Sequence, residues 1–199
     1  MKFQDLSESD KQRARDEYTS EGYLDYDWWD GVYEDAVNVA EILGIEIATR
    51  GEHNEIDIRF SGFCCQGDGA CFAGEYRWAK NACTEIVKYA PLDSELLRIA
   101  QQLTLLQITR RLLGLEPFSA TITMNGRYSH SGTMDAELHF EEDEEDPVDA
   151  IEATVTQLMR DFADWIYAQL ETENNWLYSA ECVDDALEDK EFDEDGVEV

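Results

Sequence analysis

Apolar and polar residues alternate with a period of two across two neighbouring segments in the middle of the chain. The apolar positions are Phe118, Ala120, Ile122 and Met124 in the first segment and Met134, Ala136, Leu138 and Phe140 in the second. The intervening positions carry hydroxyl, acidic and imidazole side chains. Because successive side chains of a strand point to opposite faces, this pattern predicts a β-hairpin with one buried face.

A second pair of alternating segments flanks a loop that contains three cysteines. The apolar positions are Ile56, Ile58 and Phe60 before the loop and Phe72, Gly74, Tyr76 and Trp78 after it. Asp57 and Arg59 occupy the other face of the first segment. This spacing predicts two strands joined through the loop, with Asp57 and Arg59 on the polar side.

Apolar residues recur three or four positions apart in the segments before and between the predicted hairpins. The first of these segments begins at Asp30, a favoured N-cap residue, and ends at Gly44, which suits the position after a helix. A longer apolar segment runs from Asp93 to Gly114 and carries two arginines near its end, where the helix dipole favours cations. Both segments are predicted to be helices.

Two more helices are expected in the last third of the chain. One begins with Asp146 as its cap and Pro147 as its first residue and continues to residue 171, and a short one runs from Ser179 to Leu187. Together with the hairpins they predict an α+β fold, in which an antiparallel sheet built from two hairpins is packed on one face by helices.

The length of 199 residues suits a single domain, expected over residues 1–187, followed by an acidic and flexible tail over residues 188–199. No uninterrupted apolar run approaches the roughly 18 residues that cross a bilayer, and the first residues lack the apolar core of a secretory signal. The expectation is a cytoplasmic protein. Its five cysteines are an odd number, which favours reduced thiols.

Charge narrows the function classes further. The net charge is −31, and it is unevenly distributed: residues 1–111 hold 21 acidic and 12 basic side chains, whereas residues 112–199 hold 25 acidic and three basic ones. An excess of this size repels phosphate backbones and anionic membrane surfaces, so direct binding to nucleic acid or membrane is not expected. Adaptation to high salt and simple solubility remain alternatives, although salt adaptation would spread the acid evenly.

The cysteine loop reads FSGFCCQGDGACF and admits several chemical interpretations. A zinc site needs chelating pairs of ligands, which the spacing of Cys64, Cys65 and Cys71 does not supply. A thiol nucleophile needs a base, for which the chain offers His53, His130 and His139, and the GDG sequence lacks the lysine and the following helix of a phosphate-binding loop. We favour a structural turn with no metal and no cofactor, formed by Gly62, Gln66, Gly67, Asp68 and Gly69.

The same loop carries a resemblance to known proteins. The motif FSGF, two variable residues, QGDGA, one variable residue and F is similar to that of a family of small bacteriophage and prophage proteins, some of them labelled antitoxin-like. The resemblance extends from about Trp28 to Gly196. It implies a mobile genetic element in a bacterium as the setting, and it implies no catalytic residue.

These observations lead to the hypothesis of a non-enzymatic acidic phage protein that binds a basic, nucleic-acid-binding surface on a host defence or DNA-processing protein, in the manner of a DNA mimic. The residues expected to contact this partner are Glu141, Glu142, Asp143, Glu144, Glu145, Asp146, Asp184, Asp185, Glu188 and Asp189. Aromatic residues that would serve as anchors are Trp28, Trp29 and Trp176, for which core packing is the alternative. An antitoxin that neutralises a basic toxin and a small thiol enzyme using the loop from Cys64 to Cys71 are the other hypotheses. The oligomeric state is left open.

Overall fold

The structure is a computed structural model that describes residues 1–20, 27–140, 148–193 and 197–199. Sequence analysis expects one domain over residues 1–187. By their contacts the residues group into two compact units: unit 1 comprises Met1–Asp30 and Leu170–Val199, and unit 2 comprises Gly31–Gln169. Each unit is described by itself below.

Unit 2 contains a four-stranded antiparallel sheet in the order β1-β6-β7-β8. Its strands are β1 (Ile45–Ile47), β6 (Gly74–Tyr76), β7 (Ser119–Met124) and β8 (Met134–His139). In the β7–β8 hairpin Ile122 lies opposite Ala136 and Ala120 lies opposite Leu138, and all four side chains are buried. The predicted hairpin and its buried face are therefore confirmed.

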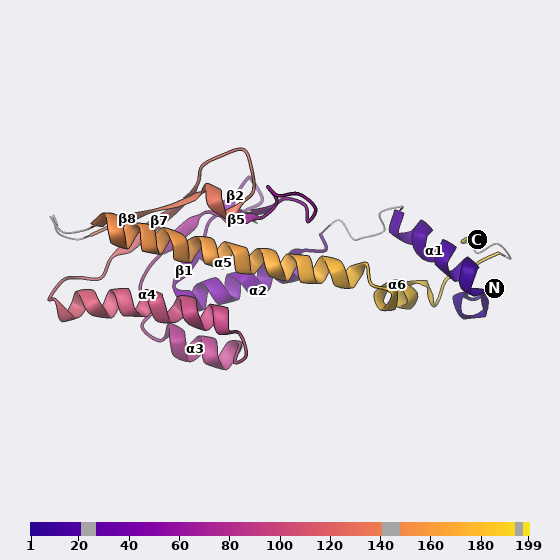
Figure 1. The fold of residues 1–199 in the computed structure, drawn as a ribbon, viewed down its shortest axis with the longest axis horizontal. Coiled ribbons are helices and arrows are strands. Elements are labelled where there is room, and N and C mark those ends of the chain that lie inside the picture. Colours follow the sequence, from indigo (N-terminus) through magenta and orange to yellow (C-terminus); the bar gives the residue numbers. More distant parts are fainter. Residues whose placement is uncertain (21–26, 141–147, 194–196) are drawn as a thin grey trace. The chain divides into compact units, whose positions relative to one another are not determined.

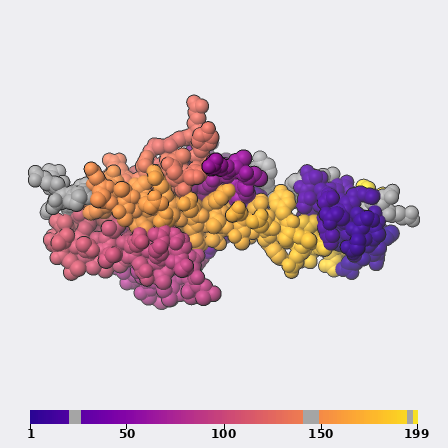
Figure 2. Space-filling view, in the orientation of Figure 1, coloured from indigo at the N-terminus to yellow at the C-terminus, as the bar shows by residue number. Residues whose placement is uncertain are grey.

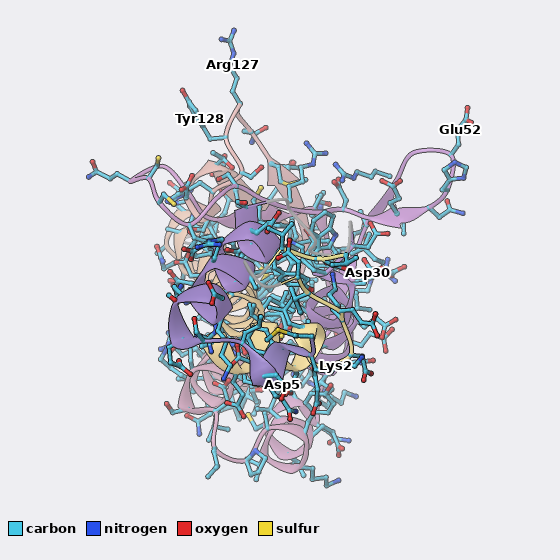
Figure 3. All side chains as sticks on the ribbon, turned by 90° about the vertical axis from the view of Figure 1, so that its right-hand side faces the viewer. Lys2, Asp5, Asp30, Glu52, Arg127 and Tyr128 are labelled. Atoms are coloured by element: carbon cyan, nitrogen blue, oxygen red, sulfur yellow. The ribbon has the colours of Figure 1, made fainter. Side chains whose placement is uncertain are left out.

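The loop between β7 and β8 projects from the surface of unit 2 (Figure 2), and Figure 3 shows Arg127 and Tyr128 extending from its tip. A short 3-10 helix, η2 (Ser131–Thr133), leads back into β8. Tyr128 is 74% exposed, so this tip contributes nothing to the core.

Two short hairpins form separate two-stranded sheets. In one of them β4 (Ile58–Phe60) pairs with β5 (Ala70–Phe72), which joins the two segments predicted around the cysteine loop. In the other, β2 (Thr49–Arg50) pairs with β3 (Glu55–Ile56), and Glu52 lies at its protruding turn (Figure 3). The α+β fold class is confirmed, but β1 and β2 were not predicted, and the strand predicted over Ile56 to Phe60 is divided between β3 and β4.

A closed ring of three backbone hydrogen bonds separates these hairpins from one another. Ala48 N–H donates to Ala73 C=O at 2.8 Å, Asp57 N–H donates to Ala48 C=O at 2.8 Å, and Ala73 N–H donates to Asp57 C=O at 3.2 Å. We call this ring the three-way junction. Each of the three chain segments changes its pairing partner there, so β1 continues with β6 while β2 pairs with β3 and β4 with β5.

The three-way junction also corrects the expectation for Asp57, which the sequence pattern placed on a polar face. Asp57 is only 8% exposed. Its carboxylate is compensated by Arg59, whose Nε lies 2.9 Å from Oδ1, and by Arg50 at 3.8 Å. A buried charge requires such partners, and the junction brings both arginines within reach.

Helices cover the inner face of the sheet. They are α2 (Asp30–Leu43), α4 (Ser94–Leu112) and α5 (Val148–Leu177), of which α5 extends into both units, while α3 (Ala82–Tyr89) packs against α4. Gln107 of α4 bonds both backbone groups of Phe118 at the start of β7, at 2.9 and 3.2 Å. Asp93 caps α4 and also accepts the indole N–H of Trp165 on α5 at 2.7 Å, which ties the two helices together.

Side chains of α5 form hydrogen bonds with the backbone groups on the outer edge of β8, along which the helix runs in Figure 1. The contacts are Ala136 N–H to Thr156 Oγ1 at 3.1 Å, Leu138 N–H to Glu152 Oε2 at 3.4 Å, and Arg160 Nη2 to Met134 C=O at 2.7 Å. The three helix residues are four positions apart and share one face of α5. This edge is therefore covered, and β1 forms the other edge of the sheet.

Unit 1 has a small core of its own. It contains η1 (Phe3–Asp5), α1 (Glu8–Ser20) and α6 (Ala180–Leu187), and the last of these matches the predicted short helix. The buried residues are Phe3, Leu6, Ala14, Val183, Leu187 and Phe192. Phe192 belongs to the segment expected to be a flexible tail, yet its N–H donates to Met1 C=O at 2.8 Å and its ring lies 6.0 Å from that of Phe3.

Two glycines allow the close approach that brings β1 to β6. Gly44 has a φ of 87°, which favours glycine, and a Cβ at this position would lie 2.1 Å from the carbonyl oxygen of Arg77. At Gly74 a Cβ would lie 2.3 Å from the carbonyl oxygen of Glu46 and 3.0 Å from the Cα of Ile47. Both obstacles are backbone atoms, so a side chain at Gly74 can be accommodated only by moving β1.

We therefore expect Gly74→Ala to lower the free energy of unfolding by about 2 kcal/mol, because β1 must separate from β6. Urea denaturation followed by circular dichroism measures the change. Gly31→Ala is the matched control, since a Cβ there meets nothing within 4 Å. The control should leave stability unchanged or raise it by about 0.5 kcal/mol. Equal stability of the two variants would contradict the close approach of β1 and β6.

Candidate partner-binding surfaces

The QGDGA loop closes on its own carboxylate. Asp68 Oδ2 accepts the backbone N–H of Cys64 at 2.9 Å and that of Cys65 at 2.7 Å, and Ser61 N–H donates to Gly69 C=O at 3.0 Å across the neck of the loop. These N–H donors from Cys65 and Cys64 lower the pKa of Asp68. Since the N–H groups that a phosphate would need are already bound to an internal anion, the loop does not form an anion cradle.

Aromatic stacking and a close backbone contact anchor the loop to unit 2. The ring of Phe63 stacks on Phe60 at 5.9 Å and on Tyr167 at 5.3 Å, and Tyr167 Oη donates to Gly62 C=O at 2.8 Å. A Cβ on Gly69 would lie 3.0 Å from the ring of His130. Gln66 and Gly67 are exposed at the tip.

The thiols differ in their exposure to solvent. Cys64 and Cys65 are exposed, Cys71 is buried, and all five cysteines are free. Burial raises the pKa of Cys71, which disfavours the reactive thiolate. His130 accepts Gly132 N–H at 2.8 Å and His139 bonds Thr121 Oγ1 at 2.7 Å. Within the described residues no group of three or more Cys, His, Asp or Glu side chains is placed to hold a metal ion.

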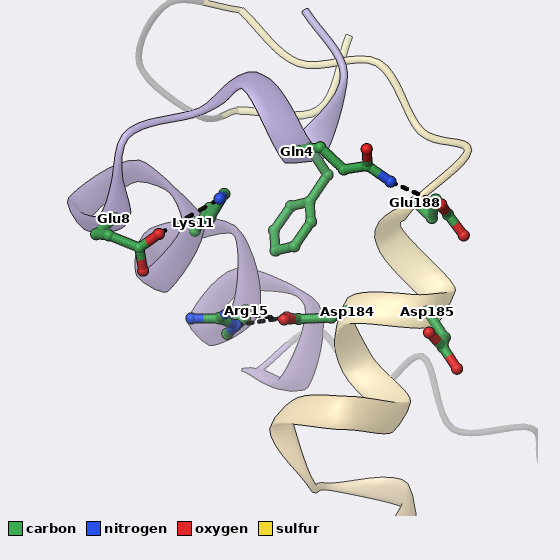
Figure 4. A pocket seen from close by; sticks show the side chains of 8 residues that line it. Gln4, Glu8, Lys11, Arg15, Asp184, Asp185 and Glu188 are labelled. Atoms are coloured by element: carbon green, nitrogen blue, oxygen red, sulfur yellow. Dashed lines mark hydrogen bonds and ion pairs between the residues drawn. The ribbon is translucent and has the colours of Figure 1, made fainter.

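Two of the acidic residues expected to contact a partner are bound within unit 1. Figure 4 shows Arg15 on α1 facing Asp184 on α6, with Nε–Oδ1 and Nη2–Oδ2 distances of 2.6 and 2.7 Å. This bidentate pair lowers the pKa of Asp184 and raises that of Arg15. Glu188 accepts a hydrogen bond from Gln4 at 2.7 Å, so Asp184 and Glu188 share a face of α6 that contacts α1 and η1.

The other expected residues have different surroundings. Asp185 and Asp189 are exposed, and the backbone carbonyl of Asp189 accepts a hydrogen bond from Lys2 Nζ at 2.8 Å. The segment from Glu141 to Asp146 lies outside the described residues. Of the proposed anchors, Trp28 and Trp29 are half-buried and make an edge contact at 5.8 Å, whereas Trp176 is 46% exposed.

Sequence reasoning missed the acidic character of the solvent face of the four-stranded sheet. Glu46 on β1 lies directly opposite Glu75 on β6, Glu75 lies opposite Thr121, and Thr121 lies opposite Glu137 on β8. All three glutamates are exposed. Like charges directly opposite one another in an antiparallel pair destabilise the pair. We call Glu46, Glu75 and Glu137 the acidic row. The alternation of apolar and acidic residues in the short segment from Ile45 to Ile47 was the available sequence signal for it.

A groove lies beside β1 at the same end of the sheet. It has a volume of about 510 Å³ and is lined by Val37, Glu41, Gly44, Ile45, Glu46, Ile47, Glu75, Arg77, Trp78 and Ala79. Arg77 pairs with Glu75 at 3.1 Å, which leaves two of the three carboxylates in the lining without a cation among the described residues. The indole N–H of Trp78 is buried and has no acceptor in the described part of the chain. The lining thus combines apolar and acidic side chains.

Comparison with known proteins identifies the family. The chain matches the family model for a domain of unknown function, DUF8835, over residues 28–180, and it therefore belongs to that family. The match includes all of unit 2, with the acidic row and the groove, but ends before most of α6. Searches of curated proteins and of solved structures found no match. None of the helices in the described ranges has the length and apolar character needed to cross a membrane.

The pH dependence of stability should show the role of Asp68. Because its folded-state pKa is lowered, the carboxylate stabilises the fold above the ordinary pKa of about 4, and this contribution disappears as pH falls through the lowered value. Asp68→Asn should therefore melt at a lower temperature than the parent at neutral pH, and the difference should vanish in strong acid. Asp164→Asn, at an exposed residue of α5, is the control. A difference for Asp68→Asn that does not depend on pH would contradict the assigned hydrogen bonds.

Charge reversal should reveal the repulsion within the acidic row. Glu46→Lys converts the contact with Glu75 into an opposite-charge pair and should raise the free energy of unfolding by about 0.5 kcal/mol. Glu137→Lys changes the net charge equally, but Glu137 lies opposite Thr121, so this substitution should raise the free energy of unfolding by a smaller amount. Urea denaturation at low ionic strength measures both. Identical gains for the two variants would show that total charge, rather than the Glu46–Glu75 contact, sets the effect.

Proposed function

We propose that the protein is a non-enzymatic binding protein that occupies a basic, nucleic-acid-binding surface of another protein and blocks it. The observation that carries this proposal is the row Glu46, Glu75 and Glu137 on one face of the sheet, where the like charges of Glu46 and Glu75 stand directly opposite each other. An arrangement that costs stability in the free protein becomes favourable when a partner supplies cations.

The distribution of acid between the units supports the same conclusion. Unit 1 holds 21 acidic and five basic side chains in 60 residues, whereas unit 2 holds 25 acidic and ten basic ones in 139 residues. DNA presents one negative charge per roughly 1.7 Å of its axis, and proteins bind it with rows of Lys and Arg. Carboxylates fixed on strands and helices attract the same rows. This matches the DNA mimicry hypothesis more closely than salt adaptation, because the acid is concentrated.

The QGDGA loop supports a non-enzymatic function. Its carboxylate is used to bind the Cys64 and Cys65 amides, and its one buried thiol, Cys71, is shielded from solvent. The resemblance of the loop to phage and prophage proteins suggests a bacterial host cytoplasm as the setting, with defence or DNA-processing proteins as targets. A basic toxin is the second candidate partner, because it would recognise the same carboxylates.

Competition with nucleic acid tests the proposal. The tagged full chain is used to capture partners from a bacterial lysate, and a purified partner is then titrated with duplex DNA of about 20 base pairs. DNA should displace the protein, and affinity should fall steeply as ionic strength rises, because long-range attraction is screened within about 8 Å at physiological salt. A partner that remains bound in saturating DNA and RNA would overturn nucleic-acid competition.

Charge-reversal variants of α6 provide a matched comparison within unit 1. Asp185→Lys, at an exposed residue, should weaken partner binding by a few-fold without unfolding. Asp184→Lys reverses the same charge but breaks the bidentate pair with Arg15, so it should also destabilise unit 1. If Asp185→Lys binds the partner as tightly as the parent chain does, the acidic surface of unit 1 takes no part in binding.

A further inference from the structure

The β1 edge of the four-stranded sheet has unpaired backbone groups. Arg77 N–H donates to Gly44 C=O and Ala48 N–H donates to Ala73 C=O, so the carbonyl of Gly44 and the amide of Ala48 face the β6 side. In an antiparallel ladder the facing direction alternates, and the N–H and C=O groups of Ile45 and Ile47 therefore point away from β6. No described residue hydrogen-bonds to these four groups. The opposite edge, β8, is by contrast covered by α5.

The groove described above lies along this edge. Its lining includes all three residues of β1 together with Val37 of α2 and Trp78, which follows β6. Its volume of about 510 Å³ leaves room for the side chains of an added strand. A free edge of this kind recruits extended peptides, in which main-chain hydrogen bonds give affinity and alternate side chains give specificity.

The chemistry of the groove defines the peptide. Alternate residues of an added strand would face the same side as Glu46 and Glu75, where lysine or arginine finds carboxylates. The residues between them would face the side of Ile47, Val37 and Trp78, which favours apolar side chains. Glu41 of α2 adds a third carboxylate to the lining.

We infer that the groove binds an extended segment of a basic partner protein, with alternating basic and apolar residues, which pairs with β1 as a fifth strand of the sheet. This inference depends on the proposed function in taking the partner to be a basic protein. It adds the mode of binding, strand addition at Ile45 and Ile47, and it specifies a sequence pattern rather than a general positive charge.

The test uses the full chain and a synthetic peptide of about seven residues with alternating lysine and valine. Glu46→Lys should weaken peptide binding by about tenfold, whereas Glu137→Lys should change it by less than about twofold. Both variants change the net charge equally, and both residues lie in the same row of the sheet. Equal weakening by the two variants would overturn the groove as the site.

Hydrogen exchange measures the backbone pairing between the peptide and β1 directly. On peptide binding, the amides of Ile45 and Ile47 should become protected from hydrogen exchange, because their N–H groups then face the added strand. A peptide with N-methyl groups on the residues that pair with β1 should bind about tenfold more weakly, and one methylated on the alternate residues should bind normally. Peptide binding without new protection at Ile45 and Ile47 would overturn strand addition.

The outcomes separate this inference from the proposed function. If DNA displaces the partner but the two glutamate variants weaken its binding equally, the proposed function stands and strand addition at β1 is overturned. If the peptide protects the amides of Ile45 and Ile47 from exchange but nucleic acid does not displace the partner, strand addition is supported and nucleic-acid competition is overturned.

Discussion

A closed ring of three backbone hydrogen bonds, among Ala48, Asp57 and Ala73, determines the course of the chain in unit 2. Each residue donates once and accepts once, so none of these groups is left for an ordinary two-strand ladder. Each segment therefore changes its partner at the ring. One consequence is the hairpin of β4 and β5, which presents the QGDGA loop. Another is that β1 pairs only with β6 among the described strands and forms an edge of the sheet. The groove beside β1 thus depends on a backbone interaction that begins two residues beyond Glu46 and two residues before Glu75.

The elements that sequence reasoning predicted are those in which apolar residues recur with the period of a strand or a helix, so that one face is buried. The β7–β8 hairpin and helix α4 satisfy this condition over at least six residues each, and the structure contains them. β1 has three residues and β2 has two, and both are too short for a period to be recognised. Asp57 was assigned to the wrong environment because its burial comes from the three-way junction, which joins residues distant in sequence.

The acidic residues show the same limit. The spacing of Asp184 and Glu188 correctly places both on one face of a helix, but it does not show that this face meets Arg15 and Gln4 near the other end of the chain. Helix α1 was itself not predicted, since Ala14 is its only buried residue within the described part. Its packing depends on Phe3, Val183 and other core residues contributed by segments more than 150 residues apart. Such partners have no local signature.

The acidic row and the β1 edge act on different aspects of recognition. Charge alone attracts any basic surface and accelerates encounter, but it does not fix a register. Backbone pairing with Ile45 and Ile47 fixes a register but is tolerant of sequence, because every residue except proline offers the same groups. Attraction and register are both determined at the pair of Glu46 and Glu75. A bound cation there reduces the repulsion between the two carboxylates, and pairing of the added strand with β1 determines the position of that cation. A partner that carries its basic residues on a helix would gain the attraction but not the pairing, so the geometry of β1 favours an extended segment over a merely basic one.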